Sequence, residues 1–136
     1  MSSIRQKRRA VVAVESAIVL PVALAILIAI VAGALMVATY QQVAAVCREA
    51  TRYASVHGYE YSQSTGNTAA TSTDVYNNVI QPRLINMDAT LLTYSVSWSP
   101  DNHQGSTVTV SMSYQLSVPL YGTVTLSSSS TSVITW

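Results

Sequence analysis

Charge is scarce in this sequence and is concentrated at one end. Of the 136 residues only 10% are charged, and four of the seven basic residues lie in the first nine positions. Beyond Ala10, three basic side chains stand against six acidic ones. Binding to nucleic acid requires a sustained basic surface. We therefore expect no nucleic-acid partner.

Cysteine and the motifs of catalysis are also nearly absent. The single Cys47 excludes a disulfide within the chain and a cysteine-based metal cluster. We interpret it as a small apolar helix residue, with an intermolecular disulfide or lipid attachment as the alternatives. His57 and His103 follow no ligand spacing, and no nucleophile elbow, phosphate loop or carboxylate pair occurs. We predict no catalytic residue, metal, cofactor or small-molecule substrate, and hence no enzyme.

The abundant feature is an apolar run. No charged residue occurs over the 32 positions from Ser16 to Cys47, and the 22 residues from Ala17 to Ala38 include no polar side chain. About 20 apolar residues are enough to cross a bilayer as a helix. Pro21 and Gly33 interrupt this run, but both are tolerated in membrane helices. We predict one transmembrane segment at about 16–38.

The flanking charges predict the orientation of that segment. The basic residues of the first nine positions hold the N-terminus in the cytoplasm, whereas the other flank offers only Arg48 and Arg52 with Glu49 between them. The C-terminal part is then outside the cytoplasmic (inner) membrane. One alternative is a secretory signal peptide cleaved near residues 32–34, although no polar stretch follows that site. A buried core helix is the other, but a short chain cannot enclose a helix that is apolar on every side.

Beyond the membrane the helical pattern continues. An apolar stripe persists at spacings of three and four as far as Ala54, and Gly58 after His57 is a candidate C-cap. We therefore predict a helix from about Val11 to His57. Residues 59–73 are expected to form a flexible polar connection.

A short helix and a sheet are expected to follow. Apolar residues from Val75 to Leu84 recur at helical spacing, with Thr73 as a candidate N-cap and Pro82 as a kink. From residue 90 onward the period changes to two, which predicts strands at about 92–98 and 108–118, and a third from Val124 towards Trp136. Residues 99–102 and Gly105 are expected to form the first hairpin turn.

These elements predict an α+β fold, in which the exposed half of the long helix and the 74–86 segment cover a sheet of three to four antiparallel strands. The domains are a cytoplasmic basic leader at 1–10, the long helix at 11–58 and an extracytoplasmic domain at 59–136. We interpret the serine- and threonine-rich run at 127–132 as an edge strand or loop.

A family resemblance sharpens this pilin-like arrangement. Residues 8–21 (RRAVVAVESAIVLP) closely resemble the opening of the TadE-like family, the minor pseudopilins of tight-adherence (Flp-type) pilus systems. Residues 48–54 (REATRYA) are similar to the family's stretch at the end of its long helix, and 118–120 and 127–132 look like its sheet. Ala10 stands where the family usually has glycine, and Ser16 where it usually has an aromatic residue.

The resemblance implies processing and assembly sites. A prepilin peptidase would cut between Ala10 and Val11, and Glu15, at the fifth position of the new chain, would neutralise the freed amine of an adjacent subunit. The alternative is a carboxylate near the headgroups with no special role. The small residues on the apolar helix would permit close approach of other helices; they are Ala25, Ala29, Ala32, Gly33 and Ala34.

Two functions follow from this reading. The first is a structural or assembly subunit of an Flp-type pilus or related secretion system, whose partners are membrane lipid, other pilin-like subunits, the peptidase and the assembly machinery. The second is a membrane-anchored surface-binding domain that never leaves the bilayer. Processing and assembly distinguish the two.

Overall fold

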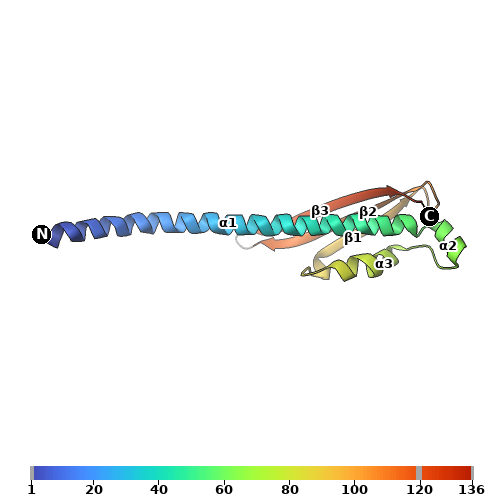
Figure 1. Ribbon diagram of the computed structural model, residues 1–136, viewed down its shortest axis with the longest axis horizontal. Helices are drawn as coiled ribbons and strands as arrows, with labels where there is room; N and C mark the ends of the chain where they lie inside the picture. Colours follow the sequence, from blue (N-terminus) through green and yellow to red (C-terminus); the bar gives the residue numbers. More distant parts are fainter. Residues whose placement is uncertain (1, 119–120, 136) are drawn as a thin grey trace. The chain divides into compact units, whose positions relative to one another are not determined.

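The structure, a computed structural model, describes residues 2–118 and 121–135, with the backbone alone for residues 2–11. The elements in chain order are α1 (Ser2–Val56), α2 (Tyr59–Thr65), α3 (Ser72–Val75), η1 (Tyr76–Ile80), η2 (Gln81–Arg83), η3 (Ala89–Leu91), β1 (Leu92–Ser99), β2 (Thr107–Val118) and β3 (Gly122–Val133) (Figure 1). The chain divides into a helical unit, Met1–Met36, and a sheet unit, Val37–Trp136; α1 belongs to both. The predicted α+β fold, a long apolar helix with a three-stranded antiparallel sheet, is confirmed. Residues 119, 120 and 136, which entered the predictions, lie outside the described residues.

Helix α1 is longer than predicted at its start. It begins at Ser2, not near Val11, and ends at Val56 instead of His57. Pro21 lies inside it without ending it, as is tolerated in an apolar helix. Gly58 is not the expected C-cap, because its φ of −77° is not left-handed and it serves as the N-cap of α2.

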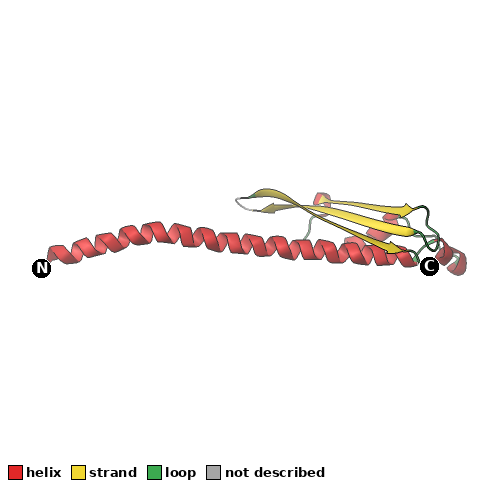
Figure 2. Ribbon diagram, turned by 90° about the horizontal axis from the view of Figure 1, so that it is seen from above, coloured by secondary structure: helices red, strands yellow, loops and turns green. Residues whose placement is uncertain are grey.

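The second half of α1 buries a stripe of small apolar side chains. Val43, Cys47, Ala50 and Ala54 are each 0% exposed. Their spacings of four, three and four place them on one face of a helix. Figure 2 shows this part of α1 running along one face of the sheet. The predicted stripe is therefore confirmed.

The sheet has the order β1-β2-β3, and both pairs are antiparallel. Every second residue of β2 points to the core, so that Val108, Val110 and Met112 are at most 2% exposed, whereas the residues between them are serine and threonine. This alternation follows from the period of two in a strand. Gly105, before β2, and Gly122, the first residue of β3, have φ values of 90° and 84°, a conformation that favours glycine.

Strand β3 lies at an edge, and serines occupy most of its inward-facing positions. Ser128, Ser130 and Ser132 are half-buried, and the outward residues between them are exposed. Small side chains there let the helix approach the strand closely. The Sγ of Cys47 lies 3.6 Å from the carbonyl oxygen of Ser128, and the Thr51 hydroxyl donates to the carbonyl of Ser130 at 3.2 Å. The edge-strand interpretation of residues 127–132 is confirmed.

The segment between helix and sheet corrects two expectations. The flexible connection predicted at 59–73 contains helix α2, whose Tyr59 amide donates to the Asn102 carbonyl at 2.8 Å. The N-cap of α3 is Thr71 instead of Thr73, and it forms a capping box with Asp74. The predicted break at Pro82 is present, because the helical segment passes from α3 through η1 to the short turn η2.

Candidate assembly and membrane surface

The first candidate surface is the apolar helix itself. The most apolar 18-residue stretch of α1 has a mean hydropathy of 2.9, and 6% of that stretch is buried. Large apolar side chains along residues 12–37 are exposed, among them Ile18 at 66%, Leu20 at 63% and Ile30 at 63%. Water disfavours such a surface strongly. Its length and composition are compatible with a membrane anchor.

Glu15 is the one carboxylate on this surface. It is exposed, and Val12, Val14, Ile18 and Val19, which neighbour it along the helix, are all more than half exposed. Among the side chains that the structure describes, ion pairs join Arg83 to Glu49 and His103 to Glu60, and none involves Glu15. A carboxylate in apolar surroundings needs a partner to remain charged. The assembly role predicted for Glu15 stays a prediction.

The small residues of α1 leave room on the same helix. Ala25 and Ala29 are exposed, Gly33 is half-buried and Ala32 is 7% exposed. A methyl group added at Gly33 would meet no atom within 4 Å, so nothing in the described chain requires glycine there. The packing role predicted for these residues stays a prediction. Of the two predicted processing residues, Ala10 and Val11, the helical backbone alone is described.

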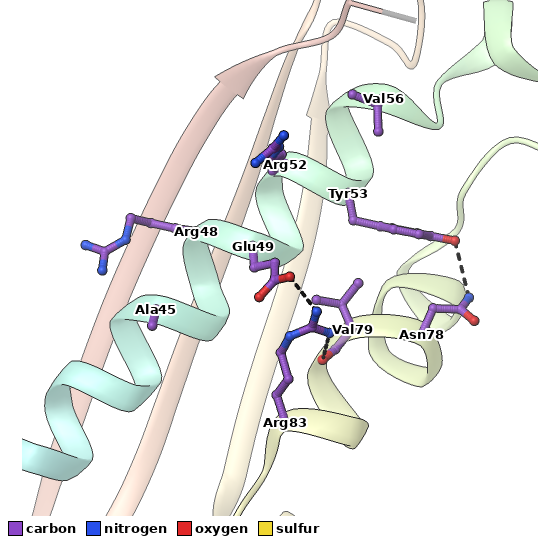
Figure 3. A pocket seen from close by; sticks show the side chains of 9 residues that line it. All are labelled: Ala45, Arg48, Glu49, Arg52, Tyr53, Val56, Asn78, Val79 and Arg83. Atoms are coloured by element: carbon purple, nitrogen blue, oxygen red, sulfur yellow. Dashed lines mark hydrogen bonds and ion pairs between the residues drawn. The ribbon is translucent and has the colours of Figure 1, made fainter.

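A second candidate surface is a groove between α1 and the α3–η2 segment, which we call the arginine groove. Its volume is about 540 Å³, and Figure 3 shows its lining residues: Ala45, Arg48, Glu49, Arg52, Tyr53, Val56, Asn78, Val79 and Arg83. Arg83 forms an ion pair with Glu49 and donates to the Val79 carbonyl at 3.3 Å. The sequence analysis treated Arg48, Glu49 and Arg52 only as charges that flank the apolar run. It did not predict the ion pair of Glu49 with Arg83, because no local spacing connects residues 49 and 83.

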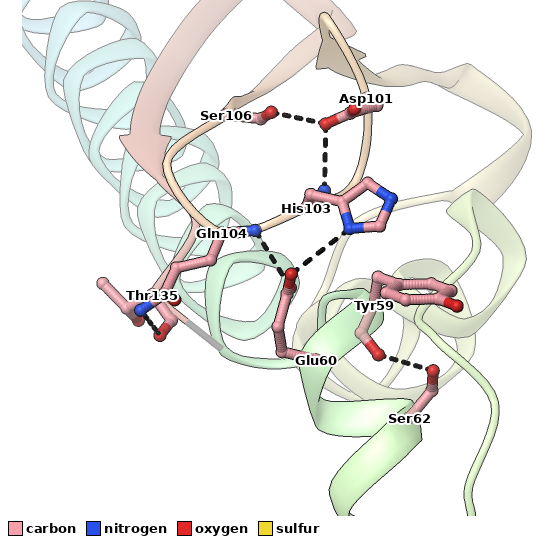
Figure 4. Close-up of polar contacts among 8 residues, drawn as sticks. All are labelled: Tyr59, Glu60, Ser62, Asp101, His103, Gln104, Ser106 and Thr135. Carbon is pink, nitrogen blue, oxygen red and sulfur yellow. Dashed lines mark hydrogen bonds and ion pairs between the residues drawn. The ribbon is translucent and has the colours of Figure 1, made fainter.

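A polar cluster lies where α2 meets the β1–β2 turn, and we call its two carboxylates, Glu60 and Asp101, the acidic end. Glu60 accepts from the ring Nδ1 of His103 at 3.2 Å and from the Gln104 amide at 2.9 Å (Figure 4). Asp101 accepts from the Ser106 hydroxyl at 2.6 Å and from the His103 amide at 3.1 Å. His103 is therefore paired with Glu60 as well as near Asp101, a contact that the sequence did not predict.

Hydrogen bonds keep both carboxylates of the acidic end ionised. Partial desolvation raises the pKa of Glu60, but the hydrogen bonds from its own amide, from His103 and from Gln104 together lower it below its usual value. The Ser106 hydroxyl and then the His103 amide lower the pKa of Asp101. The acidic end is thus negatively charged at neutral pH.

The remaining candidate residues have structural surroundings. Cys47 is 0% exposed, its Sγ lies 3.2 Å from the Val110 carbonyl oxygen, and burial raises the pKa of its thiol. The interpretation as a small apolar helix residue is confirmed. His57 stacks on Tyr53 with ring centroids 4.0 Å apart, and its Nδ1 lies 2.9 Å from the Tyr53 carbonyl oxygen. His57 thus packs against Tyr53 at the C-terminal end of α1.

Comparison with known families concerns the same helix. Residues 10–52 match the family model described as TadE-like protein. The match confirms the resemblance drawn from residues 8–21, and this family suggests involvement in tight-adherence pilus systems. The TadE-like segment (10–52) contains Glu15, the small residues and the arginine pair at 48 and 52, and it ends before the sheet begins. Comparisons with curated proteins and with solved structures found no match.

Proposed function

We propose that this chain is a pilin-like, non-enzymatic subunit of a tight-adherence pilus or related secretion system, which assembles through α1. One observation carries the proposal: the TadE-like segment contains an exposed apolar helix with a single carboxylate at its start. A bilayer can store such a helix, and the helices of other subunits can replace the lipid around it. Pilus assembly uses both environments in turn.

Processing would create the partner of Glu15. A prepilin peptidase hydrolyses the amide between Ala10 and Val11, which leaves a carboxylate on Ala10 and an α-amino group on Val11. Glu15 is then four residues from the new cation along the sequence. In an assembly of parallel helices, the amine of one copy pairs with the Glu15 carboxylate of its neighbour, which offsets the desolvation of both charges.

The orientation and partners follow from the same reading. The basic residues before the apolar run keep the N-terminus in the cytoplasm and the sheet unit outside the inner membrane. The partners are membrane lipid, other pilin-like subunits, the peptidase and the pilus assembly machinery. Ala25, Ala29, Ala32 and Gly33 allow neighbouring helices to approach.

The mature N-terminus tests the processing step. We expect mass spectrometry of the membrane-extracted protein to find a chain that begins at Val11 in cells with an active prepilin peptidase, and an intact leader in cells without it. Ala10→Lys, which places a large charged residue before the bond, should also retain the leader. A chain that keeps residues 2–10 in peptidase-positive cells would refute the processing step.

A further inference from the structure

The arginine groove gathers all the formal cations of the sheet unit. Between residues 37 and 136 the sequence has three arginines and no lysine, and all three arginines line this groove. The same stretch has five acidic side chains, and of these Glu49 alone is among the groove's lining residues. The unit therefore has one basic site within an otherwise acidic set of charges. Charges sorted in this way are complementary between copies of the same chain.

Two of the three arginines are available to a ligand. Arg83 is engaged by Glu49 and the Val79 carbonyl. Arg48 and Arg52 are exposed, and among the described side chains neither has an ion-pair partner. They lie four residues apart on α1, where like charges repel each other. Carboxylates of a partner that pair with either arginine would relieve that repulsion.

Tyr53 adds a neutral donor to the groove. Its hydroxyl oxygen accepts from the Asn78 side-chain amide at 3.3 Å, which leaves the hydroxyl hydrogen free to donate (Figure 3). Burial and the charge of Asp74 raise the pKa of Tyr53, so that the hydroxyl stays protonated. Tyr53 thus offers a hydroxyl donor on one side of the α1 wall, whereas the Arg48 side chain extends away from Tyr53 and Asn78 (Figure 3).

We propose that the arginine groove of one copy binds the acidic end of a second copy, in a head-to-tail contact of sheet units. This proposal rests on the proposed function, because it assigns an extracytoplasmic contact to the same assembly. The side chain of Glu60 is 38% exposed, so its carboxylate can reach a partner while it keeps its internal hydrogen bonds. Such a contact uses different surfaces on the two copies, and it can continue into a filament.

The positions of the two surfaces demand an axial offset between copies. Arg48 lies eight residues before Val56, the end of α1, and α2 with the acidic end lies beyond that end (Figure 1). At about 1.5 Å per residue, Arg48 lies about 12 Å and Arg52 about 6 Å before that end along α1. Parallel copies at equal depth in a bilayer do not bring them together. A copy displaced along its axis by about 6–12 Å or more does.

A charge-reversal experiment on the full chain in cells tests the proposal. One copy carries Ala45→Cys at the groove, and a second, differently tagged copy carries Gln63→Cys on the exposed face of α2. Disulfide cross-linking between the two copies then reports the contact, and the buried Cys47 does not compete. We expect a cross-linked heterodimer when all charges are native. Its absence with native charges would overturn the contact.

Reversing either surface should abolish the contact, and reversing both should restore it. We expect cross-linking to fall about tenfold or more when the groove copy carries Arg48→Glu and Arg52→Glu. The same loss is expected when the other copy carries Glu60→Lys and Gln104→Lys. In both cases like charges face each other across the contact, and their repulsion is large enough to weaken binding at least tenfold. Combining both reversals should restore it. The control Gln115→Glu, a charge added at an exposed position of β2, should leave cross-linking unchanged.

The outcomes separate this proposal from the proposed function. If the chain enters assemblies and the reversals leave cross-linking unchanged, the groove contact is wrong and the helix-mediated function stands. If each reversal abolishes cross-linking but the combination does not restore it, the copies are not held by pairing between these two charged surfaces, and the proposed contact is overturned. If the native chain never enters an assembly, the proposed function itself fails.

Discussion

Replacing Thr51 by valine isolates the hydrogen bond that joins α1 to the edge of the sheet. Thr51 is 2% exposed, and its hydroxyl has oxygen acceptors at 2.9 Å in Cys47 and at 3.2 Å in Ser130. The Cys47 carbonyl is already an acceptor in the helix, so the contact with Ser130 is the one that connects helix and strand. Thr51→Val keeps the shape of the side chain and removes the donor.

The expected loss follows from the surroundings of the hydroxyl. The Ser130 carbonyl is partly buried, and a buried acceptor left without its donor destabilises by about 1–3 kcal/mol. The added methyl group offsets up to about 0.8 kcal/mol of that loss through apolar burial. We therefore expect the free energy of unfolding to fall by about 1–2 kcal/mol. For a unit of this size, each kcal/mol lowers the melting temperature by about 4–8 °C.

Thermal unfolding of the full chain in detergent, followed by tryptophan fluorescence, measures this change. Ser55→Ala is the matched control, because the Ser55 hydroxyl is also on α1 but donates to the Arg52 carbonyl of the same helix at 2.9 Å. We expect the control to lose less than half as much stability as Thr51→Val. Equal losses in the two variants, or a stable Thr51→Val, would refute the role given to the helix–strand hydrogen bond.

Two further predictions concern acid and topology. The Thr71 hydroxyl lowers the pKa of Asp74, and the Thr90 amide lowers the pKa of Asp88. These carboxylates therefore stabilise the fold above their unfolded pKa of about 3.9, and we expect the melting temperature to fall as the pH drops from about 4 towards 2. A melting temperature that rises over this range would contradict the prediction. Gln104→Cys, in the β1–β2 turn, should react with a membrane-impermeant maleimide on intact spheroplasts, while the buried Cys47 stays unlabelled as an internal control; protection of the turn from outside reagents would refute the orientation.

Much of the fold could be predicted because its periodic elements bury one face. The period of two in residues 92–98 and 108–118 gave both strands of the first hairpin, since every second side chain enters the core. The stripe from Val43 to Ala54 likewise gave the side of α1 that packs on the sheet. Both patterns are local in sequence. They are regular because each buried position accepts only an apolar or small side chain.

The remaining features depend on contacts between distant residues. Helix α2 is polar and has no buried residue, so no periodic signal marks it. Its own backbone and the hydrogen bonds of Tyr59 and Glu60 with the β1–β2 turn hold it. The serines on the inner side of β3 break the apolar alternation because a close helix leaves room only for small side chains. The arginine groove includes the ion pair between Arg83 and Glu49, which are 34 positions apart. No spacing rule predicts a contact between residues so distant in sequence.

Glu15 provides the most direct test of assembly through α1. Its carboxylate lies outside the sheet unit, so its removal should leave folding and membrane insertion intact. A charged side chain within a bilayer is unfavourable by up to about 3 kcal/mol, so Glu15→Ala should, if anything, insert more readily. The measurement is the ratio of pilus- or complex-associated protein to membrane-retained protein. We predict normal membrane levels and loss of assembly for both Glu15→Ala and Glu15→Gln; if both variants assemble like the native chain, Glu15 has no role in assembly and the account is contradicted.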